Sequence, residues 1–233
     1  MENIIEIRNL EKFYGRFPAL NGVNLTLKGS RIIGLCGPNG AGKTTLIKIL
    51  TGLIRDYKGE ILIKDEASSA LSRRLISYQP DTSRLTKEST GYSMANYYKD
   101  MYPDFEMSVM EELFAKLNLD PRKPVGKMSK GMVEKFQLIL TMSRRAEIYL
   151  FDEPIAGVDP AARDLIMETI LTQYRKDALV VISTHLIRDV ETILDEVIFI
   201  NDGQVLLHRN CDELRSEKNM SIDELFREEY RCF

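Results

Sequence analysis

The sequence predicts an α/β fold with a mostly parallel central sheet, an N-terminal antiparallel β part and an inserted helical subdomain. Continuously apolar runs at residues 32–36, 148–151 and 179–183 are typical of strands buried on both faces, as in a parallel sheet. The start of the chain instead alternates apolar and polar residues, as half-buried antiparallel strands do. Tyr, Met and Leu recur at helical spacing through most of residues 88–145.

The chain has 233 residues, a length that suits one large domain with a subdomain. We therefore treat residues 1–233 as a single domain. Its predicted catalytic α/β core combines residues 1–87 and 146–210, and the helical subdomain occupies residues 88–145. Residues 211–233 form a charged tail that we expect to be helical.

The predicted elements of the first part follow in order. Alternation at residues 4–8 and 23–27 predicts two antiparallel strands, and residues 60–64 predict another strand. A Gly-rich loop follows the buried strand at 32–36. Apolar residues at helical spacing then predict a helix over residues 44–53.

Prolines and short turns divide the rest of the chain. Pro103, Pro121 and Pro124 interrupt the helical pattern of the subdomain. Pro160 suits the first turn of a later helix, and Asp159 is a candidate N-cap before it.

Near the C-terminus the sequence predicts a β-hairpin. Apolar segments at residues 197–200 and 204–207 flank Asn201, Asp202 and Gly203, residue types that favour a tight turn between antiparallel strands.

Composition excludes several classes of function. Hydrophobic residues make up 44% of the chain and charged residues 29%, with a net charge of −3, so no global charge points to nucleic acid or to an anionic membrane surface. The pair Arg144 and Arg145 is too short for a binding patch, and we expect it on a solvated face. No signal peptide is recognisable, and no apolar run approaches the roughly 18 residues of a membrane span. We expect a soluble protein without direct membrane insertion.

Cysteine usage favours a reducing compartment. Cys36, Cys211 and Cys232 are an odd number without metal-ligand spacing, so reduced cytosolic thiols are expected. Cys36 ends an apolar run and is expected to be a small buried hydrophobe.

A phosphate-binding loop follows the first buried strand. The pattern G-x-x-x-x-G-K-[ST] is matched in full by Gly37, Pro38, Asn39, Gly40, Ala41, Gly42, Lys43 and Thr44. Glycines let the backbone approach phosphate oxygens closely, and the following helix N-terminus supplies positive potential. Lys43 is expected to reach the β and γ phosphates of ATP and Thr44 to bind Mg²⁺, while Thr45 adds a phosphate hydrogen bond.

Chance does not explain this loop well. From average residue usage, such an octet arises by accident in roughly 1% of chains of this length. The strand before it and the helix after it are the structural context that the motif requires.

Two acids end the apolar strand at residues 148–151. Taken alone, Asp152 and Glu153 would be a solvated loop, but a buried carboxylate needs a partner. With a phosphate-binding loop in the same chain, Mg²⁺ is the natural partner of Asp152, held through water. Glu153 is then expected to act as general base on the attacking water.

The residues taken together resemble the ATP-binding cassette (ABC) ATPases that power membrane transporters, over residues 4–207. The family signature, usually Leu-Ser-Gly-Gly-Gln, is similar to Met128, Ser129, Lys130, Gly131 and Met132. Residues 156–159 resemble the loop after the catalytic acid. His185 resembles the family's switch histidine, and Tyr14 stands where the family stacks an aromatic ring on adenine.

The resemblance implies roles that the residues alone would not. Ser129 taken alone is a helix N-cap, whereas the family role gives Ser129 and Gly131 contact with ATP on the opposite subunit. His185 alone would be a surface or capping residue, whereas the family role places it at the γ-phosphate. Tyr14 alone would be a packing aromatic.

Two departures from the family pattern stand out. Lys130 replaces the usual Gly of the signature and Met132 replaces Gln. In the loop that normally links Mg²⁺ to the membrane partner through a glutamine, alignment places Asp81 at that position. Gln79, two residues earlier, is the alternative.

The implied function is the ATPase subunit of an ABC transporter that uses ATP and Mg²⁺. Its implied partners are a second ATPase subunit, identical or paralogous, and an integral membrane subunit that holds it at the cytoplasmic face of the cell membrane. The variant signature and the short tail favour export.

Two other functions compete with this one. A soluble ABC-type ATPase acting on DNA or ribosomes would carry coiled coils or two cassettes, and neither pattern occurs here. A phosphate-loop kinase is disfavoured by the acid pair, Ser129 and His185. The aromatic and Met residues of 92–102 fit either core packing or a partner groove.

Overall fold

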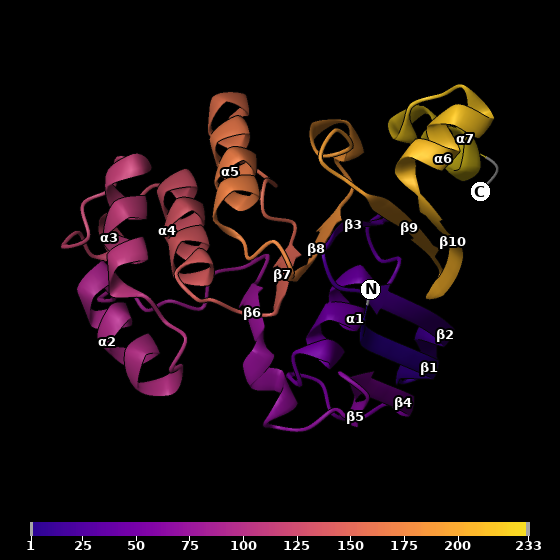
Figure 1. Ribbon diagram of the computed structural model, residues 1–233, viewed down its shortest axis with the longest axis horizontal. Helices are drawn as coiled ribbons and strands as arrows, with labels where there is room; N and C mark the ends of the chain where they lie inside the picture. The colour runs from indigo at the N-terminus through magenta and orange to yellow at the C-terminus, as the bar shows by residue number, and fades with distance from the viewer. Residues whose placement is uncertain (1, 232–233) are drawn as a thin grey trace.

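Two sheets form the frame of the protein. The computed structural model describes residues 2–231, and within that range the strands form one sheet of four strands and one of six (Figure 1). Cys232, expected to be a reduced thiol, lies outside the described residues.

The smaller sheet is antiparallel, in the order β2-β1-β4-β5. Its strands are β1 (Asn3–Tyr14), β2 (Phe17–Lys28), β4 (Lys58–Ile63) and β5 (Glu66–Ala67). The three predicted strands are confirmed, but β1 and β2 are longer than expected, at 12 residues each. They meet in a tight turn at Gly15, whose φ of +61° is one that glycine adopts at no steric cost.

The larger sheet has the order β10-β9-β3-β8-β7-β6 and is parallel except between β9 and β10. Its strands are β3 (Arg31–Cys36), β6 (Ile76–Gln79), β7 (Ile148–Asp152), β8 (Leu179–Thr184), β9 (Glu196–Asn201) and β10 (Gln204–Asn210). The predicted buried strands and the C-terminal hairpin are confirmed. No pattern in the sequence predicts β6, which pairs along β7 at the edge of the sheet.

Helices cover the sheets and both ends of the molecule. They are α1 (Lys43–Leu50), α2 (Gly91–Met101), α3 (Met107–Lys116), α4 (Lys130–Met142), α5 (Pro160–Gln173), α6 (Cys211–Lys218) and α7 (Ile222–Arg231), with short 3₁₀ turns η1 (Ser72–Leu75), η2 (Val125–Lys127) and η3 (Ile187–Asp189). Figure 1 shows α2, α3 and α4 together beyond β6, and α6 and α7 at the opposite end. The predicted N-cap of α5 is confirmed, because Asp159 accepts a hydrogen bond from the Ala162 amide.

The two faces of the large sheet pack in two different hydrophobic cores. Ile33 and Leu35 of β3 pack in one core with α1 and the antiparallel sheet. Cys36, on the other face, packs in a second core with aromatic residues of β7 and the covering helices, and its burial raises the pKa of its thiol. Its expected role as a small buried hydrophobe is confirmed.

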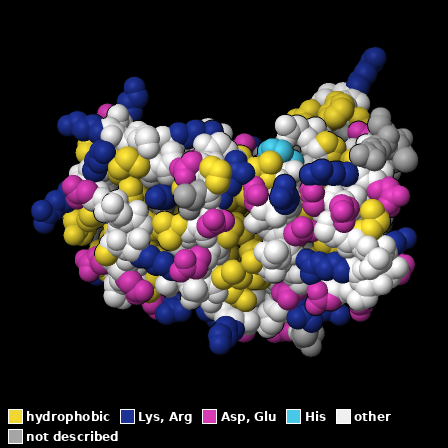
Figure 2. Space-filling view, turned by 90° about the horizontal axis from the view of Figure 1, so that it is seen from above, with side chains coloured by type: hydrophobic (Ala, Val, Ile, Leu, Met, Phe, Trp, Pro, Cys, Tyr) yellow, Lys and Arg dark blue, Asp and Glu magenta, His cyan; other side chains and the backbone are white. Residues whose placement is uncertain are grey.

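Charge is mixed over the surface. Figure 2 shows Lys and Arg side chains interspersed with Asp and Glu across the face that it displays. This pattern agrees with the small net charge of −3.

Arg144 corrects one prediction, because it is buried rather than solvated, with 2% of its surface exposed. Its guanidinium binds both carboxylate oxygens of Asp104 at 3.1 and 2.9 Å and donates to the Ile76 carbonyl oxygen at 2.5 Å. It also lies 3.8 Å above the Tyr102 ring. A single arginine has enough donors for all of these contacts, and it ties the α2–α3 connection to β6.

Glu134 is a second charged residue that the fold buries, with 6% of its surface exposed on α4. Burial raises the pKa of its carboxyl to about 7, which the charge of Lys130 opposes and that of Asp81 reinforces. The folded protein therefore holds a proton on Glu134 that the unfolded chain releases near the ordinary pKa of 4.5.

This pKa predicts a stability that falls as the pH rises from about 4.5 to about 7 and then levels off. Glu134→Gln removes the cost of ionising a buried carboxyl, so it should raise the free energy of unfolding by about 1 to 2 kcal/mol at pH 8 and change it little at pH 5. Urea denaturation at both pH values measures this. Glu112→Gln, at an exposed position of α3, is the control. Equal effects of Glu134→Gln at the two pH values would contradict the prediction.

Candidate nucleotide-binding site

The site lies where three parallel strands end side by side. β3, β7 and β8 are neighbours or next neighbours in the sheet, with Cys36 opposite Thr184 and Asp152 opposite Ser183. The carboxyl ends of parallel strands lie at one edge of a sheet, so the loops that follow them converge there.

A pocket of about 310 Å³ opens at this edge. It is lined by Tyr14, Phe17, Ala19, Asn39, Gly40, Ala41, Gly42, Lys43, Thr44, Thr45, Asp81 and Glu153. The structure thus brings most of the residues of the predicted loop together with Tyr14, Asp81 and Glu153.

Phe17 was missed by the sequence analysis. It lies opposite Tyr14 across the β1–β2 hairpin, and both rings are exposed, Phe17 by 57%. Two exposed aromatic rings beside a pocket suit a flat heterocycle. The signal available in the sequence was an aromatic residue on each side of the Gly15 turn.

Two glycines of the loop lie too close to other backbone for a side chain. A Cβ built at Gly37 would lie 2.3 Å from the Ile200 carbonyl oxygen. Gly42 has a φ of +107°, and a Cβ built there would lie 2.5 Å from the Ala19 carbonyl oxygen. Gly40 also has a positive φ, +85°, but a Cβ there would meet nothing within 4 Å. Of Gly40 and Gly42, only Gly42 therefore lies too close to β2 to carry a side chain.

Lys43 supplies the positive charge of the pocket. Its Nζ donates to the carbonyl oxygens of Gly37 and Pro38 at 2.7 and 3.1 Å and lies 3.4 Å from Oε1 of Glu153. The side chain is buried at the N-terminus of α1, where the helix dipole adds to the attraction for anions.

Asp152 has one oxygen that is satisfied and one that is not. Oδ1 accepts hydrogen bonds from Ser183 Oγ at 2.7 Å and Thr44 Oγ1 at 3.0 Å. Oδ2 is buried and has no partner among residues 2–231. Burial raises the pKa of Asp152, against the effect of the two hydrogen bonds. An orphaned carboxylate oxygen beside a hydroxyl fits a divalent cation, for which Asp152 and Thr44 are suitable ligands.

Ser183 is a site residue that the sequence analysis did not assign. It was recognised as part of a strand, but its contact with Asp152 depends on the register between β7 and β8. Its hydroxyl orients the carboxylate that would hold the metal.

Glu153, which lines the pocket, pairs with His185. His185 Nδ1 lies 3.0 Å from Glu153 Oε2. The Glu153 backbone has a φ of +51°, a left-handed conformation that is uncommon outside glycine, and its amide donates to the Ser183 carbonyl oxygen at 3.0 Å. Strained backbone of this kind persists where the surrounding structure fixes it, as at reactive sites.

Asp81 and Gln79 differ in position. Asp81 lines the pocket, whereas Gln79 is fully buried, and neither amide atom of its side chain has a partner among the described residues. Gln137 of α4 donates from Nε2 to the Pro80 carbonyl oxygen at 3.0 Å and so holds the segment between them. This geometry favours Asp81 over Gln79 as the residue facing a bound nucleotide.

The variant signature lies outside this pocket. Ser129 caps α4 by accepting a hydrogen bond from the Met132 amide at 3.3 Å, as predicted, and neither Ser129 nor Gly131 is among the described residues that line the pocket. The Lys130 ammonium lies against Gly157: a Cβ added to Gly157 would be 2.4 Å from Nζ of Lys130. Lys130 thus contacts the loop after Glu153 in its own chain.

Comparison with known proteins agrees with this geometry. A family model described as ABC transporter matches residues 20–156. The chain is 29% identical to the lantibiotic transport ATP-binding protein SrtF of Streptococcus pyogenes, with 96% of each chain covered. It is 30% identical to the Nod factor export ATP-binding protein I of Burkholderia orbicola (strain AU 1054), over 86% of this chain and 68% of the relative.

A solved structure extends the match to three dimensions. The ATP-binding subunit of an ABC transporter superposes with a TM-score of 0.85 at 26% identity, covering 97% of this chain and 98% of the other. The predicted fold class, a phosphate-loop NTPase core with an antiparallel β part and helices, is thereby confirmed.

The chain belongs to the ABC transporter family. It is an ATP-binding and ATP-hydrolysing subunit of a transporter. No helix within residues 2–231 is both long and apolar enough to cross a membrane.

Gly40 and Gly42, two of the three glycines of the loop, give a matched test of its packing against β2. Gly40→Ala meets only the conformational cost of a positive φ, about 1 kcal/mol. Gly42→Ala adds a collision with the Ala19 carbonyl oxygen and should cost about 2 kcal/mol more. Thermal unfolding without nucleotide measures both. Equal losses in the two variants would show that the β2 contact does not constrain the loop.

Proposed function

We propose that two copies of this chain, or this chain and a paralogue, enclose two ATP molecules head to tail. The observation that carries the proposal is that Lys43, Thr44 and Glu153 line one pocket whereas Ser129 and Gly131 do not. Asp152 is bonded to Thr44 of this pocket and His185 to Glu153. A second chain would supply the missing Ser129 and Gly131 from the N-terminus of its α4, whose helix-end field suits a γ-phosphate.

Within each pocket the residues divide the chemistry. The backbone amides of residues 37–44 and the Lys43 ammonium bind the phosphates, and Tyr14 stacks on adenine. Thr44 would bind Mg²⁺ with its hydroxyl, and Asp152 and Asp81 would hold the ion through water; the bound ion would neutralise phosphate charge. Glu153 accepts the proton of the attacking water, and His185 orients Glu153 through the 3.0 Å contact and faces the γ-phosphate.

A separate membrane subunit would use the energy of ATP. We propose that it binds the segment 79–81 and the helical subdomain 88–145, and so holds this chain at the inner face of the cell membrane. The relatives named for lantibiotic transport and Nod factor export support an export-type system. These relatives also disfavour a DNA- or ribosome-associated role.

Glu153→Gln tests the proposed general base. The amide keeps the size of the side chain but cannot accept the proton, so ATP turnover should fall at least about 100-fold while ATP binding remains. The variant should accumulate as an ATP-bound dimer, detected by size-exclusion chromatography with and without ATP.

Glu196→Gln is the matched control. Glu196 also pairs with a histidine, His208, at 2.8 Å, but it lies outside the nucleotide pocket. Its variant should hydrolyse ATP as the wild type does. Unchanged turnover in Glu153→Gln would exclude Glu153 as the base, and a monomeric ATP-bound variant would argue against the closed dimer.

A further inference from the structure

A lysine lies against the aromatic ring that borders the nucleotide pocket. Nζ of Lys12 lies 5.2 Å from the centroid of the Tyr14 ring, within the distance of about 6 Å at which a cation is attracted to the face of an aromatic ring. The two residues are two positions apart in β1, so their side chains leave the strand on the same face. Tyr14 lines the pocket, and Lys12 is not among the described residues that do. The ammonium therefore approaches the ring from outside the pocket.

Lys12 is buried, with 7% of its surface exposed, which is uncommon for a lysine. An ammonium removed from water needs a partner. Nζ of Lys12 donates to Oδ2 of Asp56 at 3.0 Å. Asp56 is exposed, and the water around its carboxylate screens its charge. The ion pair therefore holds the ammonium in place without cancelling its field at the Tyr14 ring.

The same ion pair joins the two parts of the nucleotide site. Asp56 lies in the segment between α1, which ends at Leu50, and β4. Helix α1 begins at Lys43, the residue that supplies positive charge for the phosphates. Lys12 thus ties the strand that carries Tyr14 to the segment that follows the phosphate-binding helix.

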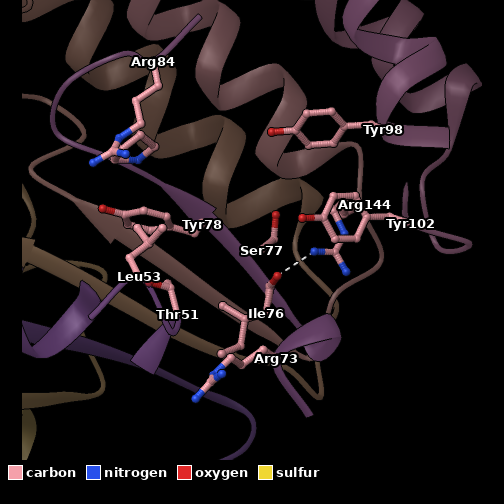
Figure 3. A pocket seen from close by; sticks show the side chains of 11 residues that line it. Thr51, Leu53, Arg73, Ile76, Ser77, Tyr78, Arg84, Tyr98, Tyr102 and Arg144 are labelled. Atoms are coloured by element: carbon pink, nitrogen blue, oxygen red, sulfur yellow. Dashed lines mark hydrogen bonds between the residues drawn. The ribbon is translucent and has the colours of Figure 1, made fainter. Parts of the chain in front are cut away.

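Asp56 itself stands apart from the spaces that could hold a ligand in this region. Figure 3 shows a separate cavity beside β6, whose lining includes Thr51 and Leu53 of the same segment. Asp56 is not among the described residues that line this cavity or the nucleotide pocket. A substitution of Asp56 therefore changes the ion pair without removing a contact to the nucleotide.

A cation at one face of an aromatic ring alters the other face. The π electrons make both faces of the ring negative, and a nearby ammonium draws this charge toward itself. A purine, whose own faces are also negative, then meets less repulsion when it stacks on the opposite face. An apolar side chain in place of Lys12 could support the Tyr14 ring but would not have this effect.

We propose that Lys12 is a positioning residue that fixes and polarises the Tyr14 ring, and so raises the affinity of the pocket for the base of the nucleotide. The inference rests on the proposed function, since it needs Tyr14 to stack on adenine. It adds a residue outside the pocket that acts on the base and not on the phosphates.

The test measures the dissociation constants of ADP and of inorganic pyrophosphate, which offers two phosphates without a base, by calorimetry on the full chain. Lys12→Met keeps the length of the side chain and removes its charge. Binding of ADP should weaken about threefold to tenfold, and binding of pyrophosphate should stay within about twofold of wild type. Equal weakening of the two ligands would overturn the inference.

Lys58→Met is the matched control. Lys58 is an exposed lysine of the same sheet, and its Nζ lies 3.9 Å from a carboxylate oxygen of Glu11. Its variant should bind both ligands within about twofold of wild type. All measurements are made well below the unfolding temperature of each variant.

Asp56→Asn separates the field of the ammonium from its part in the ion pair. The amide still offers an oxygen to Lys12 but carries no charge. ADP should therefore bind as tightly as to the wild type, or up to about threefold more tightly. A loss as large as that of Lys12→Met would overturn the inference, because only the ion pair would then matter.

Tyr14→Leu completes a double-mutant cycle. Without the ring, Lys12→Met should change ADP binding by less than about twofold. A loss as large as that seen with the ring present would overturn the inference and leave the proposed function standing. If Tyr14→Leu alone leaves ADP binding unchanged, the ring does not stack on the base, and that part of the proposed function fails.

Discussion

The hydrogen bonds that Asp152 accepts from Thr44 and Ser183 join the three segments on which the nucleotide site depends. Thr44 lies at the start of α1, Asp152 at the end of β7 and Ser183 in β8. A buried carboxylate without these donors would be costly, so its position is fixed only when all three segments are in register. The strained backbone of Glu153, one residue later, is held by the same Ser183.

The phosphate-binding loop and the acid pair could be predicted because their signals are local. The loop has a fixed residue pattern between a strand and a helix, and a run of apolar residues ending in acids marks a strand end. Ser183 could not be assigned in this way. A serine in a buried strand becomes a partner of Asp152 only through the pairing of β7 with β8, and the sequence of neither strand alone predicts that pairing.

Arg144 and β6 were missed for related reasons. The partners of Arg144 lie 40 and 68 residues away, so a pair of adjacent arginines looks like a solvated surface in the sequence. Strand β6 has only four residues, too few for a clear period, and it follows a short segment rich in Ser and Arg. Tertiary contacts rather than local preference decide both features. Phe17 shows the same limit, since its place opposite Tyr14 depends on hairpin register.

The segment that carries Tyr78 and Asp81 has a thermodynamic consequence. Tyr78 lines a cavity of about 310 Å³ beside β6, and Asp81 lines the nucleotide pocket. Three residues of extended chain span about 10 Å, so the two spaces are joined by a short piece of covalent backbone rather than by a long chain of side-chain contacts. Coupling of this kind is reciprocal. If binding of a nucleotide beside Asp81 changes the affinity of the cavity for a ligand, then binding of that ligand changes the affinity of the pocket for the nucleotide by the same factor.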